Sequence, residues 1–141
     1  MKISVCLIVK NEEKYLERCL ESIYKHVNEI IITDTWSQDK TVAIAKKYTK
    51  KIYKFEWCND FSKARNYCQQ FATWDYILWL DADEYFECNN CENLVHYIKS
   101  NTELDIIDIM RINYWIDDSN IWMEKNSKII KNYIWLHWKW K

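Results

Sequence analysis

The stretch "YILWLDADEYF", Tyr76–Phe86, sets a run of mostly apolar residues directly before three carboxylates that fall within four positions. A strand buried on both faces reads as a continuous apolar run, and the ligand of an open α/β sheet lies just beyond the carboxyl ends of its strands. Residues 76–80 therefore predict a core strand, and Asp81, Asp83 and Glu84 predict a polar site at its end.

Strand-like and helical segments alternate before this stretch. Leu16, Leu20 and Ile23 recur at helical spacing, with Cys19 and Val27 on the same face. The remaining pattern predicts strands at residues 2–10, 28–33 and 50–56 and helices at 40–48 and 61–72, the first of these capped by Ser37 or Asp39. This alternation indicates right-handed crossovers, and so an α/β fold with a mostly parallel sheet and helices on both faces.

The segment after the acids is less regular. Residues 91–101 predict a short helix whose apolar stripe is Leu94, Tyr97 and Ile98. The remainder predicts strands within residues 104–118 and 126–141, joined by a hairpin-like connection.

Composition limits the class of protein. The chain has 141 residues, of which 49% are apolar, so it can form one domain with a core. Its formal net charge of -1 provides no basic field for nucleic acid. No apolar run reaches the roughly 18 residues of a membrane span, and no signal peptide is evident, so we expect a cytoplasmic protein.

The six cysteines are expected to be free thiols in a cytoplasmic chain. Cys88 and Cys91 form a single CxxC pair without a second pair or a nearby histidine, which is weak support for zinc.

The acids after the predicted fourth strand suit a hard cation. Asp81 and Asp83 can direct two oxygen donors at Mg²⁺ or Mn²⁺, with phosphate oxygens as the other ligands. The alternative is that they merely cap the next helix. Asp34 ends the second strand and residues 10–12 follow the first, so polar groups of three strands meet at one edge of the sheet, which favours a site.

Arg65 and Asn66 lie on the predicted helix before the fourth strand. The Arg65 guanidinium could reach a phosphate there. The alternative is a solvated helix face.

Four blocks of the chain, from Met1 to about Phe86, resemble the family 2 glycosyltransferases of the GT-A (Rossmann-like) fold in order and spacing, and the rest resembles them more loosely. These blocks are "ISVCLIVKNEEKYLERCLESI", "EIIITDTWSQDKTVAIAKKY", "FEWCNDFSKARNYC" and "ATWDYILWLDADEYF". The resemblance implies a single domain at 1–141, with a nucleotide-sugar-binding half at 1–86 and the start of an acceptor half at 87–141.

The resemblance also implies roles for individual residues. Asp81 and Asp83 match the DxD motif, in which the second acid ligates the metal and the first lies toward the ribose and sugar. Asp34 matches an acid that contacts the nucleotide base. Three residues match the segment that lines the nucleotide pocket: Val9, Asn11 and Glu12.

The implied activity is metal-dependent transfer of a sugar from a nucleotide-diphosphate donor to a glycan, lipid or protein acceptor, as in cell-envelope glycan or glycoconjugate synthesis. A cytoplasmic protein, peripheral to the inner face of the membrane, would fit this activity. The chain stops before a His-Glu pair found in relatives, and the acids left as candidates for the catalytic base are Asp117, Asp118 and Glu124. Two alternatives stay open: an inactive truncated nucleotide-sugar-binding module and a sugar nucleotidyltransferase.

The chain contains no glycine and nine tryptophans, although about ten glycines are expected at ordinary frequency. The glycosyltransferases that this chain resembles have glycine where it has Trp36 and Trp74. The same match is weaker at Trp135, Trp140 and Trp115. We hypothesise that the gene comes from an organism that reads UGA as glycine and was translated with UGA as tryptophan. UGG codons at positions 36 and 74 would refute this hypothesis.

Overall fold

The computed structural model describes residues 2–86, 90–101, 103, 106–114 and 121–131. Its strands are β1 (Ile3–Val9), β2 (Glu29–Asp34), β3 (Ile52–Lys54), β4 (Tyr76–Trp79), β5 (Ile106–Tyr114) and β6 (Ile121–Lys131). Its helices are α1 (Leu16–Ile23), α2 (Thr41–Ala45), α3 (Phe61–Gln69) and α4 (Asn90–Ser100). No described helix is long and apolar enough to cross a membrane.

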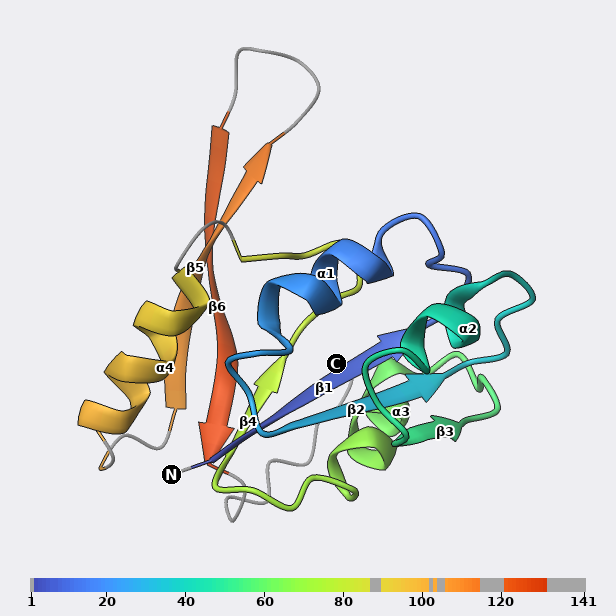
Figure 1. Ribbon diagram of the computed structural model, residues 1–141, viewed down its shortest axis with the longest axis horizontal. Coiled ribbons are helices and arrows are strands. Elements are labelled where there is room, and N and C mark those ends of the chain that lie inside the picture. Colours follow the sequence, from blue (N-terminus) through green and yellow to red (C-terminus); the bar gives the residue numbers. More distant parts are fainter. Residues whose placement is uncertain (1, 87–89, 102, 104–105, 115–120, 132–141) are drawn as a thin grey trace.

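One sheet of six strands organises the molecule, in the order β3-β2-β1-β4-β6-β5 (Figure 1). β3, β2, β1 and β4 are parallel, whereas β6 pairs antiparallel with both β4 and β5. The predicted mostly parallel α/β sheet is confirmed. β5 lies within the segment predicted at 104–118, whereas β6 begins five residues before the segment predicted at 126–141, whose residues 132–141 lie outside the described part of the chain. The chain moves outward from β1 to β3 and then returns to the other side of β1 as β4, so the strand order reverses beside β1. Open α/β sheets bind their ligands at such a reversal.

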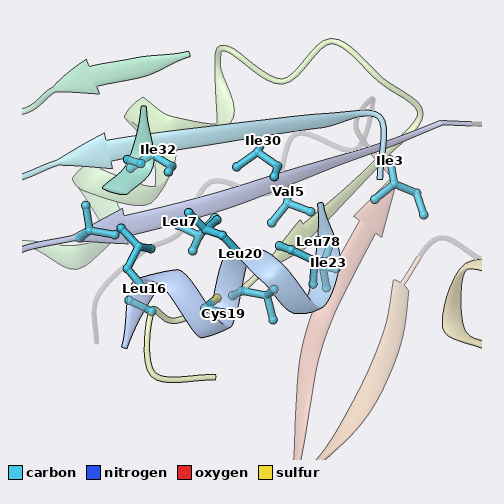
Figure 2. Packing of buried hydrophobic residues seen from close by; sticks show 14 of the residues in the cluster. Ile3, Val5, Leu7, Leu16, Cys19, Leu20, Ile23, Ile30, Ile32 and Leu78 are labelled. Atoms are coloured by element: carbon cyan, nitrogen blue, oxygen red, sulfur yellow. The ribbon is translucent and has the colours of Figure 1, made fainter. Parts of the chain in front are cut away.

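Helices cover both faces of the sheet, as the alternation of buried side chains shows. Val5 and Leu7 of β1 pack in the same cluster as Leu20 of α1 (Figure 2), whereas Cys6 packs on the other face in a cluster that includes Cys68 of α3. The predicted stripe of α1 is confirmed, with four residues buried and Val27 partly buried: Leu16, Cys19, Leu20 and Ile23. α1 therefore docks on the parallel strands through the face that its sequence predicts.

One local prediction needs correction, and the structure selects between the two caps predicted for α2. Tyr97 is 49% exposed, and the apolar stripe of α4 is instead formed by buried Ile98 with partly buried Leu94 and Val95. Of the two candidate caps of α2, Asp39 is the one used, because its Oδ1 accepts the Thr41 N–H at 2.9 Å.

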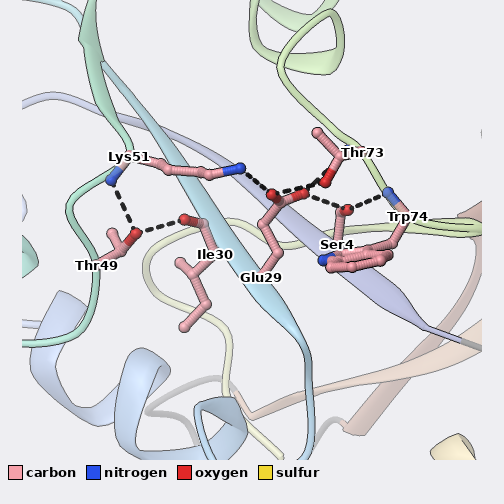
Figure 3. Close-up of polar contacts among 7 residues, drawn as sticks. All are labelled: Ser4, Glu29, Ile30, Thr49, Lys51, Thr73 and Trp74. Carbon is pink, nitrogen blue, oxygen red and sulfur yellow. Dashed lines mark hydrogen bonds and ion pairs between the residues drawn. The ribbon is translucent and has the colours of Figure 1, made fainter.

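The amino ends of β1 and β2 are joined by a buried carboxylate (Figure 3). Glu29 accepts hydrogen bonds from Ser4 Oγ (2.7 Å) and from the N–H and Oγ1 of Thr73 (both 3.0 Å), and it forms an ion pair with Lys51. We call these four residues the Glu29 cluster. Burial raises the pKa of Glu29, but the bonds from Lys51, Ser4 and Thr73 outweigh burial and hold the pKa below its ordinary value.

Candidate functional site

The carboxyl ends of β1, β2 and β4 lie at one edge of the sheet (Figure 1). Val9, the last residue of β1, pairs with Asp34, the last residue of β2, and β4 runs parallel to β1 on its other side. Three connections leave this edge: the β1–α1 loop (residues 10–15), the β2–α2 loop (residues 35–40) and the acid loop (residues 81–86). This is the arrangement that the strand-end acids predict.

The β1–α1 and β2–α2 loops are tied together by hydrogen bonds. The Asn11 N–H donates to Ser37 Oγ (2.9 Å), and the Gln38 N–H donates back to Asn11 Oδ1 (2.8 Å). The Glu12 N–H donates to Thr41 Oγ1 (2.7 Å).

Two further bonds link the same loops, from the Glu13 N–H to Asp39 Oδ2 (3.1 Å) and from the Lys40 N–H to Glu13 Oε2 (3.0 Å). Asn11 is therefore held at the edge through both its backbone and its side chain, and Glu12 through its backbone.

Val9 and Asp34 shape the base of this edge. The Val9 carbonyl accepts both the N–H (2.9 Å) and the Oγ1 hydroxyl (3.1 Å) of Thr35. Asp34 Oδ1 accepts the Ser37 N–H (3.1 Å), and Asp34 as a whole is only 2% exposed. Both residues lie where the sequence places them, but Val9 is itself buried and the carboxylate of Asp34 holds its own turn.

The acid loop is closed by its third acid. Glu84 Oε2 accepts the Asp81 N–H (2.9 Å), and the Glu84 N–H donates to the Asp81 carbonyl (3.0 Å). Asp81 and Asp83 are both exposed at the surface of the loop. Glu84 thus acts on the backbone of the loop, and the two exposed acids are the candidate ligands.

Two residues of α1 support the acid loop, and sequence reasoning did not identify them as such. The Cys19 thiol contacts the Asp81 carbonyl (3.6 Å), and Ser22 Oγ accepts the Phe86 N–H (3.1 Å). Burial, followed by the charges of nearby carboxylates, raises the pKa of Cys19 to about 12, so this thiol stays protonated and able to donate. The sequence indicates only that Cys19 lies on the apolar face of this helix, and nothing in it points to a role for Ser22.

The electrostatics join the acid loop to the β1–α1 loop. Burial and then the charges of Asp83, Asp39 and Asp81 raise the pKa of Glu12. A carboxylate is affected in this way where like charges share its surroundings. The edge is therefore a region of negative potential that a cation would relieve.

Among the described residues, no group of three or more His, Cys, Asp or Glu side chains is arranged to hold a metal ion. Asp81 and Asp83 remain as two hard oxygen donors on one exposed loop. That set fits Mg²⁺ or Mn²⁺, because Mg²⁺ in particular is commonly held by one or two carboxylates while phosphates and waters complete its shell.

Other predicted site residues lie elsewhere. Arg65 is in the middle of α3, on the face of the sheet opposite α1, and its contact with a phosphate stays a prediction. Several predictions fall on positions, or on side chains, outside the described part of the chain: Cys88, Cys91, Trp115, Asp117, Asp118, Glu124, Trp135 and Trp140.

Comparison with known proteins identifies relatives of this chain. It is 47% identical over 83 residues to a TPR repeat-containing protein of Synechococcus elongatus, a match that covers 59% of this chain and 21% of that protein. It is 41% identical over 90 residues to the glycosyltransferase SunS of Bacillus subtilis, covering 62% of this chain and 21% of SunS. The chain thus spans about a fifth of the length of these curated relatives.

A solved structure supports the fold. S. aureus TarS 1–349 in complex with UDP-GlcNAc superposes with a TM-score of 0.61 at 25% identity, covering 72% of this chain and 32% of that one. This likeness confirms the predicted GT-A fold. The family model described as "Glycosyl transferase family 2" matches residues 4–141, and the chain belongs to that family.

Proposed function

We propose that this chain is the donor-binding part of a metal-dependent glycosyltransferase, which transfers a sugar from a nucleotide-diphosphate donor to an acceptor in the synthesis of a cell-envelope glycan or other glycoconjugate. The observation that carries the proposal is the meeting of three loops at the carboxyl edge beside β1, where burial and then the charges of Asp83, Asp39 and Asp81 raise the pKa of Glu12. Family membership and the UDP-GlcNAc complex of TarS support the same class of donor.

Each site residue has a role in this proposal. Asp83, with Asp81, would hold Mn²⁺ or Mg²⁺, which supplies charge neutralisation for the diphosphate as it leaves. Val9, Asn11, Glu12 and Asp34 would form the nucleoside end of the pocket. Arg65 would approach a phosphate.

The proposal divides the chain functionally. Residues 1–86 would bind the nucleotide sugar, and residues 87–141 would begin the acceptor side. We place the protein in the cytoplasm, at the inner face of the membrane. Membership of a glycosyltransferase family argues against the sugar nucleotidyltransferase alternative.

The test is thermal unfolding with UDP-, GDP- and dTDP-sugars, each with Mn²⁺ and with EDTA. One nucleotide series is expected to stabilise the protein only with Mn²⁺, by about 2.7 kcal/mol at a hundredfold excess over its dissociation constant. Asp83→Asn should abolish the Mn²⁺-dependent part. Glu17→Gln, a change on the exposed side of α1, should retain it.

An equal stabilisation in EDTA, or its survival in Asp83→Asn, would contradict the metal site. An absence of stabilisation by all three series, both in this chain and in its Trp36→Gly variant, would contradict donor binding altogether.

A further inference from the structure

Trp36 has a backbone conformation that its side chain disfavours. Its φ is 67°, in the left-handed region, where an L-residue with a bulky side chain is strained by on the order of 1 kcal/mol. The other described residues with positive φ are Asn11 and Asn59, and asparagine is a residue type that tolerates this region. Trp36 is therefore the exception among the three.

The neighbours of Trp36 impose this conformation. On one side, the Thr35 N–H is bonded to the Val9 carbonyl (2.9 Å). On the other side, the Ser37 N–H donates to Asp34 Oδ1 (3.1 Å), and Ser37 Oγ accepts the Asn11 N–H (2.9 Å). Because both flanks are fixed, the backbone at position 36 is held in the left-handed region. The strain is built into the turn that carries Asp34.

The indole does not offset the strain by entering the core. Trp36 is 56% exposed, and its ring contacts the Lys54 ammonium at 5.0 Å from the ring centroid. Lys54 pairs with Asp34 across β2 and β3, and the Phe55 N–H donates to the Asp34 carbonyl (3.0 Å). The indole thus lies on the β3 side of the loop, against Lys54, the residue that pairs with Asp34.

We propose that the Trp36 indole covers the nucleoside end of the donor pocket, so that residue 36 sets donor affinity; this inference rests on the proposed function. A small residue at position 36 opens access to Asp34, and a glycine also relieves the backbone. The same geometry agrees with the hypothesis that this position is encoded as glycine. Trp74, the other position in that hypothesis, is not among the residues with positive φ.

The experiment compares Trp36→Gly, Trp36→Asn and Trp36→Ala in the 141-residue chain. Unfolding without ligand reports the backbone: the Gly and Asn variants should melt about 4 °C above the Ala variant, because glycine and asparagine adopt the left-handed region more readily than alanine. Calorimetric titration with UDP, GDP and dTDP in Mn²⁺ reports access: the Gly and Ala variants should bind one of them more tightly than the parent, by on the order of tenfold. Trp74→Ala, whose indole lies toward the amino edge against Lys2, should bind like the parent.

The outcomes separate this inference from the proposed function. If the parent binds a nucleotide and the Gly and Ala variants bind it equally or more weakly, the covering role is wrong and the function stands. If neither the parent nor any variant binds a nucleoside diphosphate, both the proposed function and the covering role are rejected. Melting temperatures that do not separate Gly and Asn from Ala would reject the strain at Trp36.

Discussion

Carboxylates lie at both ends of the same parallel strands, in opposite electrostatic conditions. At the amino end, Glu29 is buried. Its oxygens accept hydrogen bonds from Ser4 and Thr73 and form an ion pair with Lys51, and these partners lower its pKa (Figure 3). At the carboxyl end, Glu12 lies among other acids and its pKa is raised. The first arrangement supplies the charge with partners and stabilises the fold, whereas the second leaves a negative region that suits a cation.

Of the substitutions that test this contrast, Glu29→Ala should change the free energy of unfolding most. Glu29→Ala removes the acceptor shared by three segments, and we expect the free energy of unfolding to fall by about 3 kcal/mol. The matched control is Glu17→Ala, which removes an ion pair with Lys47. The two side chains, Glu17 and Lys47, are 46% and 58% exposed, so this change should lower the free energy of unfolding by less than about 0.5 kcal/mol. Denaturant titration measures both. Similar losses in the two variants would show that Glu29 has no special structural role.

The pH dependence sharpens the same comparison. The pKa of Glu29 is lower in the folded protein than its ordinary value of 4.5, so the unfolded chain binds more protons between the two values. Its contribution is complete above pH 4.5 and is lost as the pH falls through the lower folded-state pKa.

Unfolding free energies of the parent and Glu29→Gln, measured from pH 7 downward, should therefore converge in acid. A difference between the two proteins that is constant with pH would argue against this linkage.

The smallest expected change in stability, and one of opposite sign, comes from a substitution at the carboxyl end of the strands. Asp83→Asn removes one of the charges that raise the pKa of Glu12, so without metal we expect stability to be unchanged or to rise by up to about 0.5 kcal/mol. Denaturant titration in EDTA is the measurement. A clear loss of stability would mean that Asp83 is a structural acid like Glu29.

The sequence predicts most of the parallel half of the molecule. The spacing of Leu16, Leu20 and Ile23 specifies the docked face of α1, and strand-end acids identify the edge of the site, because both follow from local periodicity and parallel topology. The position of β6 between β4 and β5 could not be predicted, since strand pairing over such distances leaves no local pattern.

Partners of single residues were also beyond prediction. Glu29 falls near the start of a predicted strand, and nothing local reveals that Thr73 and Lys51 reach it. Tyr97 was placed in the stripe of α4 by spacing alone, although Val95 packs there instead. By contrast, the absence of glycine directs attention to position 36, where the backbone does adopt a conformation that favours glycine.

The central place of β1 has a consequence for biosynthesis. One edge of this apolar strand pairs with β2, but the other waits for β4, whose first residue, Tyr76, pairs with Ile3. At typical translation speeds the nascent chain needs roughly 4 to 15 seconds to supply that partner. During this interval the unpaired apolar edge of β1 can pair with other chains. The sheet is therefore most exposed to aggregation while the chain is still being synthesised.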